Sequence, residues 1–202
     1  MTKFLNLKTA FCLVLVGGMT CSAVVARPRT RHAALVVGWH DEMNDLSTWQ
    51  SLGGINGPDI FAARAGAMTL RLPQVPQGYP YTYQWGGVTR QASVDLGRYP
   101  VLVACVSRVG DGSYAHLELE ERDFSGKSVR TLRAPTLQGK GLSVMDVGQA
   151  WGPQTRRINL RLIVGGALSG TSCEYAWVRF VRREDVAKLQ AQTSDQQVRL
   201  EP

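Results

Sequence analysis

The segment HLELEERD, residues 116–123, places three side chains that could do chemistry on one face of a strand. His116, Glu118 and Glu120 alternate with apolar residues, and side chains alternate between the two faces of a β-strand. A pair of carboxylates is the apparatus of glycoside hydrolysis, but such a pair must flank the scissile bond from opposite sides. Same-face neighbours on one strand instead lie about 7 Å apart and point the same way. The pattern therefore favours a charged solvent face, and we predict no catalytic residue here.

Other catalytic patterns are missing from the sequence. There is no GxSxG nucleophile elbow, and the two remaining histidines, His32 and His40, have no evident serine or aspartate partner. The glycine pairs at 53–54, 86–87 and 165–166 lack the lysine and the strand–loop–helix context of a phosphate-binding loop, so we interpret them as turns. The sequence therefore predicts a protein that is not an enzyme.

A second segment, GYPYTYQW at residues 78–85, carries an aromatic ring at every second position. In a β-strand all of these rings lie on one face. A dry core is costly for tyrosine, because each buried hydroxyl without a partner costs about 1–3 kcal/mol. Pro80 cannot donate to a sheet ladder, which places the segment at an edge or at the beginning of a strand. We therefore predict an edge strand with a partly wet ring face, in which Trp85 is the ring expected to be buried.

Rings on a wet face suit carbohydrate, because the apolar face of a pyranose packs on a ring while polar neighbours bind its hydroxyls. Trp151 is a further candidate, because a large ring in the loop AWGPQ is hard to bury. Trp177 is another, and strict alternation of EYAWVRFV would place it with Tyr175 and Arg179, away from the core. Core or edge packing is the alternative for each ring. The predicted ligand-binding residues are Tyr79, Tyr81, Tyr83, Trp85, Trp151 and Trp177.

The first 26 residues are predicted to be a cleaved secretory signal peptide. Lys3 and Lys8 form a short basic region before the apolar run at residues 10–16, and residues 24–26 are small residues that could form the cleavage site before Arg27. Glycines interrupt the run, which falls short of the roughly 20 residues that a membrane-spanning helix needs. We therefore expect an exported protein without a transmembrane span, located in a periplasm, at the cell surface or outside the cell.

The charge of the chain is basic but dispersed. The formal net charge is +7 over 202 residues, and the one compact basic run, Arg27, Arg29 and Arg31, directly follows the predicted cleavage site. A nucleic-acid-binding protein more often shows a basic stripe interleaved with exposed aromatic residues. We therefore expect no nucleic-acid partner and interpret residues 27–34 as a basic, flexible N-terminus.

The hydrophobic pattern of the mature chain has a period of two almost everywhere. In INLRLIV, for example, Ile158, Leu160 and Leu162 share one face. Turn residues separate many short segments of this kind, which predicts an all-β, antiparallel two-sheet β-sandwich over residues 35–182. The polar tail, residues 183–202, begins with a helix candidate and is expected to be helical or disordered. Strands are predicted at residues 35–39, 60–63, 67–72, 79–85, 88–96, 101–107, 114–122, 128–133, 142–147, 157–164 and 173–181, and the helix at 183–192.

Cys105 and Cys173 are the two cysteines that remain after removal of the signal peptide, and each lies in a predicted strand. An even pair in an exported protein favours a disulfide. The alternative is two buried free thiols, because buried cysteine behaves as a small hydrophobic residue. No cysteine–histidine cluster has the spacing of metal ligands, so we do not expect structural zinc.

Three segments in order resemble the galactose-binding-like jelly rolls, which include many noncatalytic carbohydrate-binding modules of secreted bacterial proteins. They are DEMNDLSTW at 41–49, SVDLGRYPVLVACV at 93–106 and EYAWVRFV at 174–181. The resemblance covers residues 35–182 and implies a jelly roll whose first and last strands are neighbours. It implies noncatalytic binding of carbohydrate. The alternative is a structural or protein-interaction sandwich of the cell envelope, so the expected partner is carbohydrate or an envelope protein.

The resemblance also implies a structural calcium ion near the first and last strands. Ala176 stands about where such modules carry an aspartate in the final strand. Asp41 and Asp45 could still supply the hard oxygen ligands that calcium requires, and Glu174 is the acidic residue of the last strand. A solvated acidic loop is the alternative. The metal ligands to be tested are Asp41, Asp45 and Glu174.

Overall fold

The structure is a computed structural model that describes residues 37–52, 60–64, 66–74, 78, 81, 83–123, 125–167 and 170–198. The predicted signal peptide and basic N-terminus, residues 1–34, lie outside the described residues, as do Tyr79 and Pro80. The described chain belongs to one compact unit that begins at Ala34.

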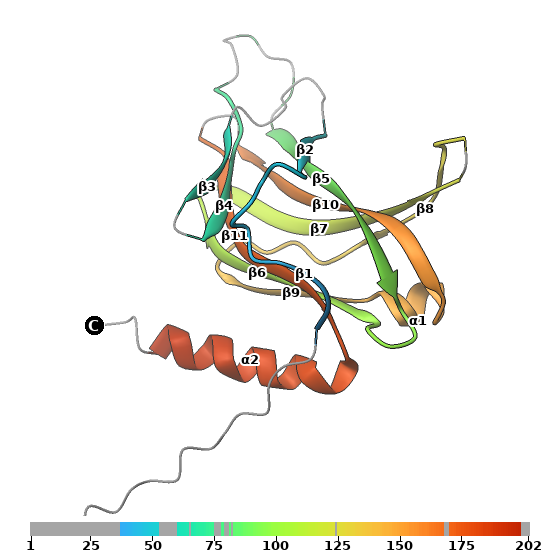
Figure 1. Cartoon of the computed structure of the whole chain (residues 1–202). Helices are drawn as coiled ribbons and strands as arrows, with labels where there is room; N and C mark the ends of the chain where they lie inside the picture. The colour runs from blue at the N-terminus through green and yellow to red at the C-terminus, as the bar shows by residue number, and fades with distance from the viewer. Residues whose placement is uncertain are drawn as a thin grey trace, which may run out of the picture. The chain divides into compact units, whose positions relative to one another are not determined.

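Two antiparallel sheets pack face to face (Figure 1), which confirms the predicted all-β sandwich. One sheet has the strand order β3–β4–β11–β6–β9, and β1 pairs with β11 next to β4. This pairing makes the first and last strands neighbours, as the resemblance implied. The strands of this sheet are β1 (Val37–Asp41), β3 (Ile60–Arg64), β4 (Ala67–Arg71), β6 (Val101–Val109), β9 (Gly141–Asp146) and β11 (Ser172–Val181).

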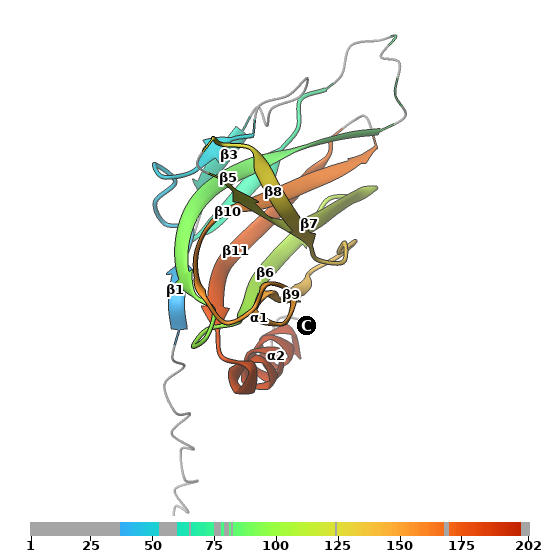
Figure 2. The same cartoon turned by 90° about the vertical axis from the view of Figure 1, so that its right-hand side faces the viewer.

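The second sheet has the strand order β2–β5–β10–β7–β8. Its two long strands, β5 and β10, pair from Tyr83 opposite Ala167 to Asp95 opposite Thr155, and they curve across the molecule (Figure 2). The strands are β2 (Gln50–Ser51), β5 (Tyr83–Asp95), β7 (Ser113–Arg122), β8 (Ser128–Arg133) and β10 (Thr155–Ala167).

The core lies between the two sheets and explains the period of two. Leu117 on β7 and Leu160 on β10 point inward and are fully buried, and they belong to one apolar cluster with Leu102 and Phe180 of the other sheet. Burying each such side chain contributes about 1.5–3 kcal/mol to folding. The outward positions of the second sheet are consequently left for polar, charged and aromatic residues.

Two of the glycine pairs lie within strands, so the prediction that they form turns is wrong. Gly86 and Gly87 lie within β5, and Gly165 and Gly166 lie within the neighbouring strand β10, opposite Trp85 and Gln84. A Cβ atom at Gly87 would collide with the carbonyl oxygen of Leu162. At Gly87, Gly165 and Gly166, neighbouring groups approach the backbone too closely for a side chain. The pair at 53–54 lies outside the described residues.

Two helices flank the sheets. The short helix α1 (Val147–Trp151) was not predicted, and the carboxylate of Asp146 caps it by accepting a hydrogen bond from Gln149 N at 2.8 Å. Helix α2 (Arg183–Val198) confirms the predicted C-terminal helix and extends it. Its Leu189 packs in a small apolar cluster on the outer side of the first sheet. Within the described part of the chain, neither helix has the length and apolar character needed to cross a membrane.

A bulge in β11 overturns the strict alternation expected for EYAWVRFV. The pairing of β11 with β6 shifts register on both sides of Tyr175, which turns this ring into the core, where it is fully buried. Its hydroxyl donates to the carbonyl oxygens of Ile163 at 2.8 Å and His116 at 3.1 Å. Tyr175 therefore joins the two sheets, and Trp177 and Arg179 remain on the outer side.

The predicted disulfide is wrong, because Cys105 and Cys173 are both free thiols. The neighbouring strands place Cys173 opposite Val109 and Cys105 opposite Trp177, several residues apart along the ladder. Cys173 belongs to the core, whereas Cys105 is only partly buried. Burial raises the pKa of both thiols above the usual value of 9.0. The alternative of two free thiols on different strands is the one that the structure adopts.

Candidate functional site

A continuous groove crosses the outward face of the sheet β2–β5–β10–β7–β8. It consists of three adjoining hollows of about 390, 440 and 870 Å³. The first and second share Leu52 and Arg161, and the second and third share Gln91, Arg122 and Asn159. The groove thus extends from the beginning of β5 to the hairpin between β7 and β8.

Aromatic side chains from β5 and β7 form one end of the groove. Tyr83 and Trp85 are 59% and 54% exposed. Strand pairing places Trp85 opposite Gly165, which in turn lies opposite Tyr114. The Tyr114 ring lies over Gly165, since a Cβ atom there would collide with it, and it stacks on His116 at a centroid distance of 5.9 Å. We call Tyr83, Trp85, Tyr114 and His116 the aromatic platform.

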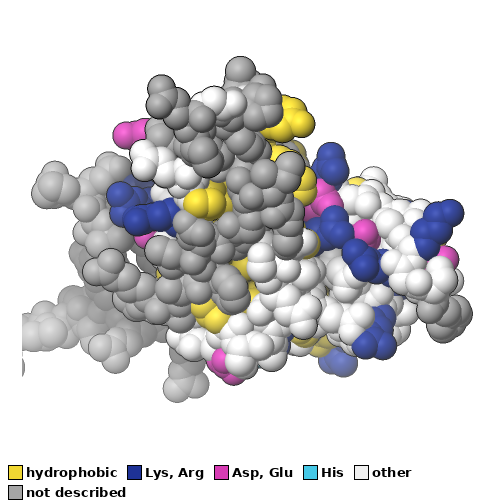
Figure 3. All heavy atoms as spheres, turned by 90° about the horizontal axis from the view of Figure 1, so that it is seen from above, with side chains coloured by type: hydrophobic (Ala, Val, Ile, Leu, Met, Phe, Trp, Pro, Cys, Tyr) yellow, Lys and Arg dark blue, Asp and Glu magenta, His cyan; other side chains and the backbone are white. Residues whose placement is uncertain are grey.

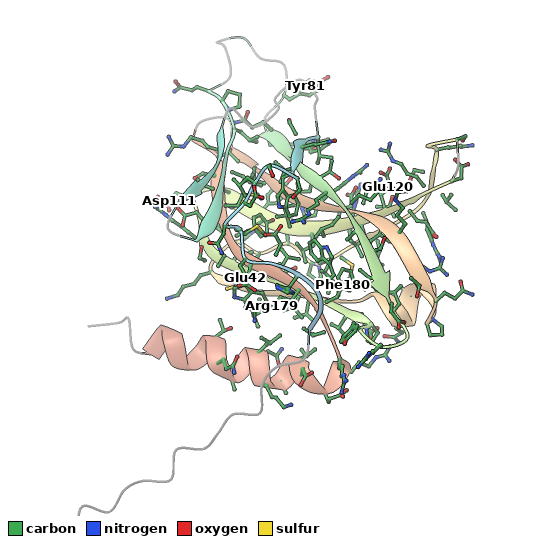
Figure 4. The ribbon with its side chains drawn as sticks, viewed as in Figure 1. Glu42, Tyr81, Asp111, Glu120, Arg179 and Phe180 are labelled. Atoms are coloured by element: carbon green, nitrogen blue, oxygen red, sulfur yellow. The ribbon has the colours of Figure 1, made fainter. Side chains whose placement is uncertain are left out.

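The ring face of β5 is wet, but the expectation that Trp85 is buried is wrong, because it is nearly as exposed as Tyr83. The inward positions of β5 are taken instead by Gln84 and Gly86, and Gln84 Nε2 donates to Pro73 O at 3.2 Å. β5 lies next to the edge of its sheet, where the short strand β2 pairs only with residues 88–89. Tyr81 precedes the strand and is 58% exposed (Figure 4), whereas Tyr79 lies outside the described residues.

The other two candidate tryptophans lie away from the groove. Trp151 is buried because α1 folds its ring into the core, so the expectation of an exposed loop ring is wrong. Trp177 is on the other sheet, where the Arg179 guanidinium stacks on it at 4.4 Å. Glu42 accepts two hydrogen bonds of 3.0 Å from Arg179, and the two side chains lie next to each other in Figure 4.

A network of arginines and glutamates follows the aromatic platform along the groove. Arg161 on β10 donates to Glu118 at 2.6 Å and to Glu120 at 2.5 Å, so that it bridges the two carboxylates. Arg133 donates to Glu118 at 2.7 Å, and Arg122 donates to Glu120 at 2.6 Å. Glu118 and Glu120 share a strand face as predicted, but the arginines bury both of them, so the expected solvated face is wrong.

The network keeps Glu120 charged. Burial raises the pKa of Glu120, but hydrogen bonds from Arg122 and Asn159 and the charge of Arg161 outweigh this effect, and the pKa falls below its usual value. A carboxylate held in its ionised form is a poor general acid. Two carboxylates face three guanidinium groups, so the network itself carries an excess of positive charge.

The ring groups of the platform are neutral. Burial lowers the pKa of His116 below 6.5, and the charge of Glu118 opposes this shift without reversing it. Burial, together with Tyr83, raises the pKa of the Tyr114 hydroxyl above 10. At pH 7 the platform therefore offers uncharged ring faces and a tyrosine hydroxyl that can donate a hydrogen bond.

Polar side chains line the middle of the groove. Thr89 and Gln91 come from outward positions of β5, and Asn159 comes from β10. Arg157 donates a hydrogen bond to Gln91 Oε1. Amide and hydroxyl groups both donate and accept hydrogen bonds, which suits a ligand that carries many hydroxyl groups.

The predicted calcium ligands do not come together. Asp41 is buried and accepts hydrogen bonds from Met43 N at 2.8 Å, Trp49 Nε1 at 2.9 Å and Arg90. Asp45 accepts one from the backbone of a nearby serine, and Glu174 lies beside an arginine on β6. Within the part of the chain that the structure describes, no three His, Cys, Asp or Glu side chains form a metal-binding group. Asp41 instead fixes the loop after β1.

Several groove residues were missed by sequence reasoning. Tyr114 could have been found, because it precedes His116 by two positions and so shares its strand face. Asn159 and Arg161 could be placed on the polar face of INLRLIV, but only the register of β10 against β7 brings them to Glu118 and Glu120. Further groove residues outside the predicted set include Gln50, Leu52, Thr89, Gln91, Arg122, Arg133, Arg157 and Ile163.

Comparison with known proteins found similarity only among solved structures. No protein-family model matches the chain, and no curated protein matches it. The module TmCBM61, solved with β-1,4-galactotriose, is 15% identical, with a TM-score of 0.40, and the match covers 70% of this chain and 93% of that one. The C-terminal family 22 carbohydrate-binding module of Clostridium thermocellum Xyn10B is 13% identical, with a TM-score of 0.43 and coverages of 74% and 96%.

A third structure is the CBM22-1 xylan-binding domain of Paenibacillus barcinonensis Xyn10C. It is 15% identical, with a TM-score of 0.37, and the match covers 74% of this chain and 99% of that domain. All three likenesses have identities of 15% or less and TM-scores below 0.5, so they carry no argument about this chain. The function is therefore argued from the residues of this chain.

Proposed function

We propose that this protein is an exported, noncatalytic binding module that holds a carbohydrate chain in the groove of the sheet β2–β5–β10–β7–β8. The observation that carries this proposal is the exposure of Tyr83 and Trp85 next to Tyr114, at one end of a polar groove. Sugar rings pack their apolar faces on such aromatic rings. The export part of the proposal rests on residues 1–26 of the sequence.

The length of the groove favours a polymer over a single sugar. The three adjoining hollows share lining residues, so a ligand can pass from the aromatic platform to the polar middle without leaving the surface. One sugar unit would stack on the platform. The following units would meet the hydrogen-bonding side chains of Gln91 and Asn159.

The carboxylates of the groove favour binding over hydrolysis. Glu118 and Glu120 point from the same strand, and Arg161 binds both of them. They cannot flank a glycosidic bond from opposite sides, which hydrolysis by a carboxylate pair requires. Their role is to hold the arginines in fixed positions beside the ligand.

Affinity electrophoresis through gels that contain a panel of polysaccharides tests the proposal. We expect at least one polysaccharide to retard the wild-type protein, and we expect Tyr83→Ala and Trp85→Ala to restore free migration. Tyr81→Ala is a matched control, because it removes a ring of similar exposure that does not line the hollow at the platform. Unchanged migration through a broad panel, or equal effects of all three substitutions, would contradict the proposal.

The exposure of Tyr83 and Trp85 also favours a second function, an interface with an envelope protein or a second copy of the chain. Sedimentation velocity separates the two functions. A dimer that Trp85→Ala dissociates would support the interface. A monomer at all concentrations, combined with retardation by a polysaccharide, would support the carbohydrate site.

A further inference from the structure

The groove carries more positive than negative charge along the path proposed for the sugar chain. We propose that its ligand is an anionic polysaccharide, whose carboxylate or sulfate groups bind to arginines in the middle and at the far end of the groove. This inference rests on the proposed carbohydrate-binding function and narrows the class of ligand.

The middle hollow of the groove is lined by arginines and uncharged residues. Arg90, Arg122 and Arg161 line it together with threonine, glutamine, asparagine and leucine side chains, and none of the described acidic side chains lines it. The charge of Arg90 is balanced by Asp41, which lies below it on β1. The charge of Arg161 is balanced by its ion pairs with Glu118 and Glu120. The excess positive charge therefore resides on other arginines.

Arg122 and Arg133 carry this excess charge. Arg122 binds Glu120 through Nε, and Arg133 binds Glu118 through Nε, although Arg161 already neutralises part of both carboxylates. Within the described residues, the terminal nitrogens of these two arginines make no hydrogen bond. Their side chains are 48% and 71% exposed, so the terminal nitrogens remain accessible to a ligand.

Arg157 adds a further positive charge between the middle and the far hollow. It lies on an outward position of β10, lines the far hollow and, among the described residues, donates a hydrogen bond to the uncharged Gln91 without pairing with a carboxylate. The basic side chains beside acidic ones are visible in the right-hand part of the view from above (Figure 3). The arginines of the groove thus follow one another along the path of an extended ligand.

The acidic side chains near the far hollow are engaged elsewhere. Glu121 is bound by Arg130 and by Arg156, the latter at 2.8 Å. Asp123 accepts hydrogen bonds from Ser125 and Lys127 in the β7–β8 turn, which lower the pKa of its carboxyl below 3.8. Asp123 keeps its negative charge, but the far hollow is lined by four arginines, Arg122, Arg130, Arg156 and Arg157, against these two acids, so its lining remains net positive.

Arginine is well suited to this recognition. Its planar guanidinium group binds a carboxylate or a sulfate through two parallel hydrogen bonds, and such charge-assisted bonds are about twice as strong as neutral ones. A neutral polysaccharide would stack on the platform equally well but would leave these donors to water. The arginines should therefore discriminate between an anionic polymer and its neutral counterpart.

The experiment compares polymers that differ in charge alone. Polygalacturonate is run beside the same polymer after chemical reduction of its carboxyl groups, and dextran sulfate is run beside dextran, to separate carboxylate from sulfate recognition. We expect one anionic polymer to bind about tenfold more tightly than its neutral counterpart, the effect of about one charge-assisted hydrogen bond. Raising the sodium chloride concentration should weaken that binding.

Variants show whether the arginines of the groove are responsible. Arg133→Gln and Arg157→Gln should each weaken binding to the anionic polymer severalfold and leave the neutral counterpart unaffected. Arg108→Gln is the matched control, because it removes the same charge from a highly exposed site on the other sheet. Thermal melting of each variant identifies any loss of binding that is caused by misfolding.

Each result decides between the two proposals. Tight binding of a neutral polymer, lost in Trp85→Ala and no weaker than binding of its anionic counterpart, would overturn the anionic ligand and support the carbohydrate site. Binding of anions that Arg108→Gln weakens as much as Arg133→Gln would also overturn it, because general attraction would then suffice. If no polymer, charged or neutral, binds the protein, both proposals are contradicted.

Discussion

Replacing Arg161 by methionine should destabilise the protein through the two glutamates that it bridges. The guanidinium group lies 2.6 Å from Glu118 and 2.5 Å from Glu120, and the side chain of Arg161 is only 19% exposed. Methionine retains most of the apolar volume and removes the charge. Both carboxylates, whose side chains are less than 10% exposed, would each lose one of their positive neighbours.

The expected size of the effect follows from the partners that remain. Removing one member of a buried ion pair costs about 3–5 kcal/mol, because a charge is left without compensation. Here Glu118 retains Arg133 and Glu120 retains Arg122, so we expect a smaller loss of about 2–3 kcal/mol. The free energy of unfolding of a protein domain is about 5–15 kcal/mol, so a loss of this size is readily measured.

The control removes a guanidinium group from the same carboxylate at an exposed position. Arg133 binds Glu118 at 2.7 Å, but its side chain is 71% exposed. Exposed ion pairs contribute about 0–1 kcal/mol, so Arg133→Met should change the free energy of unfolding by no more than this. The contrast between the two arginines tests whether burial makes the network important.

The pH dependence gives a second test with a defined sign. The pKa of Glu120 in the folded protein lies below its usual value of 4.5, so its ionised form stabilises the fold at neutral pH, and this stability is lost as the pH falls through the lowered pKa. Without Arg161, the pKa of Glu120 should rise, because the charge of Arg161 is one of the causes that lower it. The stability difference between wild type and Arg161→Met should therefore be largest at pH 7 and should shrink below about pH 4.5.

Urea unfolding followed by tryptophan fluorescence at pH 7 and at several lower pH values measures both quantities. Equal losses for Arg161→Met and Arg133→Met would refute the argument from burial. A loss that stays constant down to pH 3 would show that the carboxylates are not the cause. Either result would show that the network of arginines and glutamates does not stabilise the protein in this way.

Three further predictions concern other parts of the molecule. Gly165→Ala should displace the Tyr114 ring and weaken polysaccharide binding about tenfold, without a large decrease in the unfolding temperature. Unchanged binding in affinity electrophoresis would argue against a role for this ring. In the native protein an alkylating reagent should modify Cys105 slowly and Cys173 only after unfolding, and mass analysis without reductant that finds no free thiol would count against the structure. Asp41→Ala should lower the free energy of unfolding by about 2–4 kcal/mol, because it leaves a buried indole N–H and Arg90 without their acceptor, and a thermal melt within one degree of wild type would contradict this.

Local pattern was sufficient for most of the fold. The strand at 128–133 has the predicted bounds, and the strands near 101–107 and 114–122 differ from β6 and β7 by a residue or two. Alternation and turn residues determine such elements because they depend on neighbours in sequence. The glycine pairs at 86–87 and 165–166 misled the prediction, because glycine marks turns and close strand contacts alike.

The candidate site could be predicted only in part. The wet face of Tyr83 and Trp85 followed from the cost of burying tyrosine hydroxyls, although the sequence analysis expected Trp85 to be buried. The shared face of Glu118 and Glu120 followed from alternation, but not their burial under Arg161. That burial depends on a strand some forty residues away along the chain.

By itself the sequence determined the all-β class, the position of most strands and the face on which each side chain of a regular strand lies. Those properties are local, since they follow from a period of two. The tertiary structure alone decided the partners: Tyr114 over Gly165, Arg161 between two glutamates, and the bulge that turns Tyr175 inward. Register between strands distant in sequence is set by how the two sheets fill one core, and a change of one residue in register would bring different side chains together.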